Sequence, residues 1–280
     1  MSPHRQSPTT VPLSHDMAGA TGPPVLLIQG VGAIGTAWRH QIEALAENHR
    51  VLSFDNRGIG RSPASPEPLT IEGMAADTLA LLDRVRWPSA HIVGHSMGGL
   101  IACQLALEAP RRVRSLSLLC TFSRGPEAAR LTPWVLWMGL RTRLGSRPMR
   151  RSAFLKMLFS KKTLATADHD RLAKDTGDLV GRDLADSPPI LLHQLRACAR
   201  HDVRSRLPEL AGIPTSVISA EFDRIAHPSY GRALAAAIPH ASFHLHHGVS
   251  HGHLLEQPEW LNHRLIHHIA AAESTITLTR

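Results

Sequence analysis

Apolar and polar positions along this chain follow two different periods, and these periods predict strands and helices in turn. A short apolar run ended by Gly30 predicts a strand at 25–29, and strand-like segments follow at 51–54, 90–93 and 113–119. Between these runs, apolar positions spaced three or four residues apart predict helices, at 38–47, 70–86 and 100–108. Strands that alternate with helices favour a mostly parallel central sheet flanked by helices on both faces.

This alternation is interrupted in the middle of the chain. Between about 122 and 206 the pattern predicts helices without a convincing strand, at 134–140, 154–159 and 190–199. Strands and helices then return, as strands at 215–219 and 242–246 and helices at 230–238 and 260–271. The simplest interpretation is an α/β core made of 1–121 and 207–280, with a helical cap inserted at 122–206. The tail at 273–280 is expected to be loosely held.

Composition places the chain among globular proteins of one α/β domain. Of its 280 residues, 43% are hydrophobic and 19% are charged, so it can bury a sizeable core. No apolar run is long enough to span a membrane, and the first 24 residues lack the apolar centre of a secretory signal. We therefore expect a cytoplasmic location and no membrane partner. Its three cysteines are widely spaced, which argues against a disulfide framework and a zinc site.

The formal net charge of +8 is concentrated in the predicted cap. Ten Lys or Arg and one acidic residue lie between Arg124 and Lys162, and six aspartates follow between Asp168 and Asp186. Aromatic residues make up only 4% of the chain, which argues against a nucleic-acid surface. A solvated basic face is the simplest interpretation, and an anionic substrate or an acyl carrier remains the alternative.

A glycine-rich turn joins the strand predicted at 90–93 to the following helix. It reads Gly94-His95-Ser96-Met97-Gly98, which is a G-x-S-x-G pattern. Such a turn holds its serine in a strained conformation that exposes the hydroxyl, and close backbone approach requires small residues two positions before and after it. The amide of Met97, which opens the helix, would face a negatively charged oxygen formed at the same place. We predict that Ser96 is a nucleophile.

A serine nucleophile requires a base, and the base requires an acid that orients it. Asp223 follows the strand predicted at 215–219, at the carboxyl end where sheet-based active sites gather, whereas Glu221 continues that strand more directly. The base is harder to choose, because five histidines crowd one stretch: His244, His246, His247, His251 and His253. The first three lie on or next to a predicted strand. The pattern alone does not decide between the two loop histidines, His251 and His253. No cysteine or acidic residue is spaced to complete a metal site with this cluster, so no metal is expected.

These segments together resemble the α/β-hydrolase superfamily, in its branch of small esterases, enol-lactonases and C–C hydrolases. The matching segments cover nearly the whole chain outside the insertion: Val25–Gly32, Phe54–Ser62, Gly94–Gly99, the strand end at Asp223, and His251–Pro258. The resemblance implies that His251 is the base, because Glu256 and Pro258 follow it at the family's spacing. It also implies that the amide of Val31 is a second oxyanion donor. Relatives usually carry His-Gly where this chain has Gln29-Gly30.

These residues predict an acyl-transfer mechanism without an organic cofactor. Ser96 would attack a carbonyl, His251 would accept its proton, Asp223 would stabilise the imidazolium, and the amides of Val31 and Met97 would bind the oxyanion. The bond would be a carboxylic ester, a lactone or a thioester. Cleavage of a C–C bond by the same triad is the main alternative. Four apolar residues could line the cap, although a buried helix face explains them equally well: Trp134, Trp137, Met138 and Phe154.

Two other classes of protein are weaker alternatives. Gly30, Gly32 and Gly35 form a G-x-G-x-x-G pattern after a strand, and Asp55 lies 20 residues past Gly35, as in NAD(P)- or FAD-binding oxidoreductases. This interpretation leaves Ser96 and the residues paired with it unexplained. A binding protein on a hydrolase fold would usually have lost the nucleophile or the base, and this chain retains both.

Overall fold

A seven-stranded sheet forms the centre of the computed structural model, which describes residues 9–125 and 132–278. The strands lie in the order β1-β3-β2-β4-β5-β6-β7, and all pairs are parallel except β1 with β3. Their bounds are β1 (His15–Ala18), β2 (Pro24–Ile28), β3 (Arg50–Phe54), β4 (Ala90–His95), β5 (Val113–Leu119), β6 (Thr215–Ala220) and β7 (Ser242–His246). The predicted mostly parallel sheet is confirmed. Strand β1 was not predicted because it is a short, partly exposed edge strand without an apolar run.

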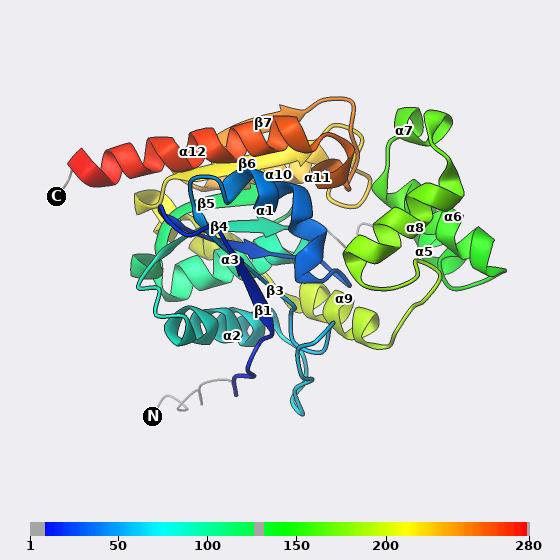
Figure 1. Cartoon of the computed structure of the whole chain (residues 1–280), viewed down its shortest axis with the longest axis horizontal. Coiled ribbons are helices and arrows are strands. Elements are labelled where there is room, and N and C mark those ends of the chain that lie inside the picture. Colours follow the sequence, from blue (N-terminus) through cyan, green and yellow to red (C-terminus); the bar gives the residue numbers. More distant parts are fainter. Residues whose placement is uncertain (1–8, 126–131, 279–280) are drawn as a thin grey trace.

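Helices cover both faces of this sheet, as Figure 1 shows. On one face lie α1 (Arg39–Leu45) and α12 (Pro258–Leu278), and on the other lie α2 (Ile71–Arg84), α3 (Met97–Glu108) and α10 (Pro228–Ala237). Side chains of β2 alternate between the two layers, with Val25 and Leu27 in one cluster and Leu26 and Ile28 in the other. Because both faces are covered, β2 and β4 are buried at every position, and β2 is apolar throughout.

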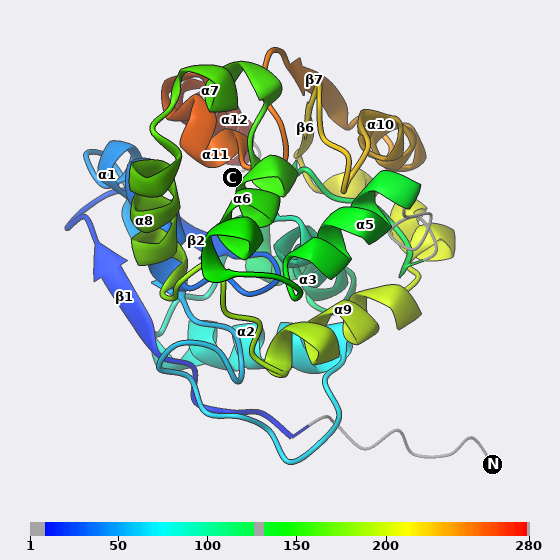
Figure 2. The same ribbon diagram turned by 90° about the vertical axis from the view of Figure 1, so that its right-hand side faces the viewer.

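Among the described residues, five α-helices lie between β5 and β6, where the cap was predicted. They are α5 (Pro133–Arg141), α6 (Arg147–Leu158), α7 (Lys161–Thr166), α8 (His169–Val180) and α9 (Ile190–Arg200). An isolated antiparallel bridge joins Arg124 to Asp202 where the inserted segment leaves and re-enters the core. A small apolar cluster of its own includes Leu155, Phe159 and Val180. Figure 2 views the molecule from the side on which these helices lie over the sheet. The boundaries at 122 and 206 stay a prediction.

Shorter helical segments complete the described chain. They are η1 (Gly35–Trp38), η2 (Pro110–Arg112), η3 (Arg204–Gly212) and α11 (His253–Glu256). Within the described residues, no helix combines the length and the apolar character that crossing a bilayer requires.

Two segments for which the sequence predicted no helix are helical, the stretch at 168–186 that contains six aspartates and the tail that was expected to be loosely held. The Asp-rich stretch contains helix α8, which begins at the N-cap Asp168 and ends at Gly181 in the left-handed conformation. The aspartates obscured these capping signals, which favour a helix. The tail expected to be loose is helical from Glu273 to Leu278, because α12 continues, while residues 279–280 lie outside the described part. Glu273 fixes this end through Arg114, with Nε to Oε1 at 2.7 Å, and through His91 at 3.0 Å.

Candidate active site

Ser96 occupies the sharp turn between β4 and α3, in backbone geometry that few L-residues adopt. Its φ is 55° and its ψ is −119°. A Cβ on Gly94 would meet the carbonyl oxygen of Gly98 at 2.3 Å, and a Cβ on Gly98 would meet that of Ile28 at 2.1 Å. The requirement for small residues at these two positions is therefore confirmed. Two backbone contacts hold the turn: the Ser96 amide donates to Leu119, and the Thr121 hydroxyl donates to the Ser96 carbonyl.

The fold brings Ser96, His251 and Asp223 together from three distant parts of the chain. His251 Nε2 lies 3.1 Å from Ser96 Oγ, and His251 Nδ1 lies 2.7 Å from Asp223 Oδ2. All three side chains are buried. The ionised carboxylate of Asp223 accepts a hydrogen bond, so Nδ1 of His251 carries a proton. In the uncharged form of the ring, Nε2 is then free to accept a hydrogen bond from the serine hydroxyl.

The competing acid and base lie elsewhere. Glu221 accepts a hydrogen bond from the Gly248 amide and pairs with the exposed His247 at 3.4 Å. His253 is fully buried on α11, with its Nδ1 3.2 Å from Nδ1 of His246. Neither residue takes part in the hydrogen bonds that join Ser96, His251 and Asp223. The geometry thus favours Asp223, which its place at a strand end had predicted, and His251, which the family's spacing had predicted.

Asp223 is held in its charged form although it is buried. Burial by itself raises the pKa of this carboxyl. Electrostatic attraction to His251, the hydrogen bond from that ring, and the amides of Ala226 and Ile225 outweigh burial, so that the pKa lies below its ordinary value. A charged acceptor beside Nδ1 can stabilise an imidazolium formed when His251 takes a proton from Ser96.

The two predicted oxyanion donors lie near the serine and have no competing partners. Met97 opens α3 directly after Ser96, and Gly30, which precedes Val31, lies so close that a Cβ there would be 3.0 Å from Ser96 Cβ. Among the described residues, the amides of Met97 and Val31 donate no hydrogen bond to protein. Two such amides, from two loops that meet next to Ser96, can bind a developing negative charge.

His95, which precedes Ser96, holds the backbone at His251. Its Nε2 lies 3.0 Å from the carbonyl oxygen of His251. Burial lowers the pKa of His95 to about 3, and the neighbouring His251 ring adds to the effect. His95 is therefore neutral at ordinary pH, and its Nε2–H donates to that carbonyl.

Buried neutral histidines predict a loss of stability in mild acid. The pKa of His95 is about 3 and that of His91 about 4, both lowered by burial, against 6.5 for the ordinary group. Between these values and pH 6.5 the unfolded chain binds protons that the folded chain does not, so stability falls as pH falls through this window. We expect each group to contribute on the order of 3 kcal/mol across the window. The measurement is the free energy of unfolding by urea at a series of pH values.

A substitution at His95 provides the control for this prediction. His95→Gln removes the titrating ring and keeps a side-chain donor for the His251 carbonyl, so its stability should depend less steeply on pH below 6.5. His263, an exposed histidine of α12, is the matched control, and His263→Gln should leave the slope unchanged. An unchanged slope in His95→Gln would contradict the prediction.

One group of potential metal ligands lies within the site. Among the described residues, ligand atoms of His95, Cys120 and His251 lie within 4.8 Å of one another. Both nitrogens of His251 are already hydrogen bonded, and burial raises the pKa of the Cys120 thiol well above its ordinary value. Metals bind the thiolate form of cysteine, so this donor set suits an ion poorly. The histidine cluster named in the sequence contributes only His251 to it.

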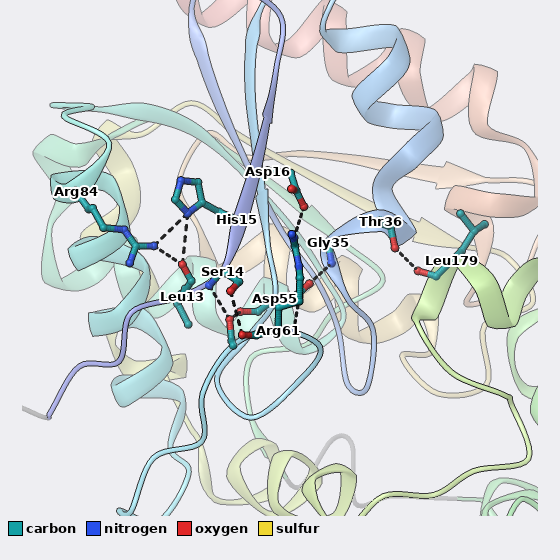
Figure 3. Close-up of polar contacts among 11 residues, drawn as sticks. Leu13, Ser14, His15, Asp16, Gly35, Thr36, Asp55, Arg61, Arg84 and Leu179 are labelled. Atoms are coloured by element: carbon teal, nitrogen blue, oxygen red, sulfur yellow. Dashed lines mark hydrogen bonds and ion pairs between the residues drawn. The ribbon is translucent and has the colours of Figure 1, made fainter.

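The glycine pattern at Gly30–Gly35 serves another purpose than dinucleotide binding. Asp55 is 3% exposed, and its two carboxylate oxygens accept hydrogen bonds from the amides of Gly35 and Arg61, at 2.8 and 2.9 Å. Figure 3 shows Asp55 between these two segments. The carboxylate that would have to bind a ribose is thus occupied in bracing the loop that contains Val31.

Two of the apolar side chains that could have lined the cap, Trp134 and Trp137, have other surroundings. The Trp137 side chain is 55% exposed. The Trp134 ring is covered by the guanidinium of Arg224, the residue after Asp223, with Cζ 4.4 Å from the ring centroid. Part of the basic run is paired within the insertion, because Arg147 binds Asp183 and Asp186 while Arg151 also binds Asp183. Ion pairs with aspartates of the same insertion, on a face open to solvent, therefore account for Arg147 and Arg151.

Two residues bind the loops that contain Val31 and His251, and these contacts were not predicted from the sequence. Glu256 accepts hydrogen bonds from Ser160 and Thr163 of the insertion and from Ser250, which precedes His251. Gln194 of α9 accepts one from Gly32. The family spacing used Glu256 only to identify His251, and no pattern near Gln194 indicated its contact.

Known proteins are similar to this chain over almost its whole length. The family model described as alpha/beta hydrolase fold matches residues 23–258. "Putative carbamate hydrolase RutD" of Variovorax paradoxus is 32% identical over 266 residues, covering 93% of this chain and 97% of that protein. The structure of "Putative non-heme bromoperoxidase BpoC" of Mycobacterium tuberculosis has a TM-score of 0.81 at 28% identity, covering 96% of this chain and 99% of that one. An enol-lactonase from Burkholderia xenovorans has a TM-score of 0.75 at 26% identity, covering 92% and 96%.

Proposed function

This chain belongs to the α/β-hydrolase fold family and is a hydrolase, and we propose that it cleaves a carboxylic ester, lactone or thioester through Ser96, His251 and Asp223. One observation carries the proposal: a continuous hydrogen-bonded chain runs from the buried carboxylate of Asp223 through His251 to Ser96 Oγ. This arrangement makes a hydroxyl nucleophilic at neutral pH.

The proposed reaction proceeds in two halves. Ser96 Oγ attacks the substrate carbonyl while its proton passes to His251 Nε2, and the amides of Val31 and Met97 bind the oxyanion. His251 then gives this proton to the leaving group, which leaves an acyl group on Ser96. Water, deprotonated by His251, attacks the acyl-enzyme, and the acid product leaves with Ser96 restored. Asp223 stays ionised throughout and stabilises the imidazolium.

The class of bond is set by what the two amides and the serine can reach, which is a carbonyl carbon with a leaving group. The proteins similar to this chain are named for a carbamate and for an enol-lactone, which both contain such a carbonyl. We therefore include carbamates and enol-lactones beside simple esters and thioesters as candidate substrates. Cleavage of a C–C bond next to a carbonyl by the same three residues is the alternative chemistry.

Labelling with a fluorophosphonate tests the proposal directly. This probe reacts with an activated serine, and we expect one label per chain, located at Ser96 by peptide mapping. Urea-unfolded protein is the control. It should not be labelled, because Ser96 is reactive only when the fold places it next to His251. A panel of p-nitrophenyl esters, thioesters, enol-lactones and carbamates then ranks the leaving groups. Label at any other serine, or none in folded protein, would refute the proposal.

A further inference from the structure

The residue after the proposed oxyanion donor Val31 is held on both sides by the inserted helices. The Gly32 amide donates to Oε1 of Gln194 at 2.8 Å, and the Gly32 carbonyl accepts a hydrogen bond from the guanidinium of Arg182. Gln194 lies on α9, and Arg182 lies just past the end of α8. Two segments of the insertion thus bind the two successive peptide groups that flank Gly32, Gln194 the one shared with Val31 and Arg182 the one shared with Ala33.

No space separates these helices from the loop. Gly32 has φ +71°, and a Cβ there would meet Cδ2 of Leu191 at 2.5 Å and the Arg182 guanidinium at 3.1 Å. A third link joins the Thr36 hydroxyl to the carbonyl of Leu179 in α8, at 3.0 Å, as Figure 3 shows. The loop at 30–36 is therefore seated against the insertion along its length.

The Gln194 side chain makes no other hydrogen bond among the described residues than the one to the Gly32 amide. The side chain is also fully buried. A buried amide group placed without such a bond would cost free energy, so the acceptor role of Oε1 explains why a polar residue occupies this position.

The base loop is tied to the insertion in a parallel way. The Gly252 amide, directly after His251, donates to the carbonyl of Leu158 at 2.7 Å. Glu256 links Ser250 to Ser160 through its two carboxylate oxygens. The insertion thus contacts the His251 loop through the end of α6 and the Val31 loop through α9 and the segment after α8.

From these contacts we infer that Gln194 is a positioning residue that keeps the Val31 amide aimed at the reacting carbonyl, an inference that rests on the function proposed above. The Val31–Gly32 peptide plane shares the Val31 Cα with the donor amide, so fixing one plane restricts the other. An oxyanion donor acts only when it is aimed before the charge develops. The insertion thereby completes the oxyanion site as well as covering it.

The experiment compares Gln194→Met with wild type and with Leu195→Met. Methionine matches the length of glutamine and lacks the acceptor, while Leu195 is an exposed neighbour on α9. We expect kcat of Gln194→Met to fall on the order of 10- to 100-fold with KM nearly unchanged, since a misplaced donor weakens only the transition state. The affinity for a trifluoromethyl ketone, which forms a tetrahedral adduct on Ser96, should fall by the same factor. Leu195→Met should match wild type.

Other outcomes separate this inference from the proposed function. Unchanged kcat and adduct affinity in a Gln194→Met protein that still labels at Ser96 would overturn the inference and leave the function intact. A raised KM with unchanged kcat would overturn it as well, because Gln194 would then bind substrate. Absence of label at Ser96 in wild type would refute the function itself. If Gln194→Met does not fold, Arg182→Met removes the other contact to Gly32 and should show the same fall in kcat.

Discussion

Replacing Ser96 by alanine should lower kcat by about 10⁶-fold, to the residual rate that binding and the oxyanion donors alone provide. Without Oγ no acyl-enzyme forms, and His251 has no hydroxyl to deprotonate. His251→Ala should cost a similar factor, and the double variant should be no worse than either single one, because the residues act as one unit. Steady-state kinetics on the best ester of the panel measures all three variants.

Cys120→Ala is the matched control for this prediction. Cys120 is the other buried nucleophilic side chain close to His251, and burial raises the pKa of its thiol well above the ordinary value, which keeps it protonated. We expect this variant to keep its activity within about tenfold of wild type and to retain its label at Ser96. A Ser96→Ala protein with normal turnover, or a Cys120→Ala protein without any, would show that the nucleophile is wrongly assigned.

Replacing Asp223 by asparagine should lower kcat by about 10⁴-fold at neutral pH while the protein stays folded. Asparagine has the same shape, but it lacks the charge that stabilises the imidazolium, and its amide can favour the wrong tautomer of His251. The buried, ionised state of Asp223 makes this loss large, because a charge interacts more strongly with His251 away from water. Kinetics and a thermal unfolding midpoint on the same preparation distinguish lost chemistry from lost structure.

Glu221→Gln controls for the choice of acid. Glu221 lies two residues earlier, is partly exposed, and pairs with His247 away from Ser96. Its pKa is lowered mainly by the Gly248 amide, so its charge serves the turn after β7. Its removal should leave kcat almost unchanged. If Glu221→Gln lost more activity than Asp223→Asn, the acid would be the other carboxylate.

The parts of this protein that were predictable share a local cause. Strand β2 is a continuous apolar run because both of its faces are buried, and such a run is visible in sequence. The turn at Ser96 was visible because close backbone contacts leave room only for glycine at positions 94 and 98. Helix α8 was not predicted because many of its residues are polar or charged and face solvent. Its apolar side is narrow, so the helical spacing of apolar positions is weak in the sequence.

By itself the sequence determined the α/β architecture, the place of the helical insertion, and the identity of Ser96 as the candidate nucleophile, because each depends on short-range pattern. The sequence favoured Asp223 over Glu221 by its place at the strand end, and it left His251 and His253 to the family spacing. Only the tertiary structure shows that Asp223 and His251, each more than 100 positions from Ser96, share one hydrogen-bonded chain with it. It also decided that Asp55 braces a loop and that Gln194 holds Gly32 across 162 residues of chain. Contacts across such separations arise when helices and strands pack, and they leave no periodic trace in the order of the amino acids.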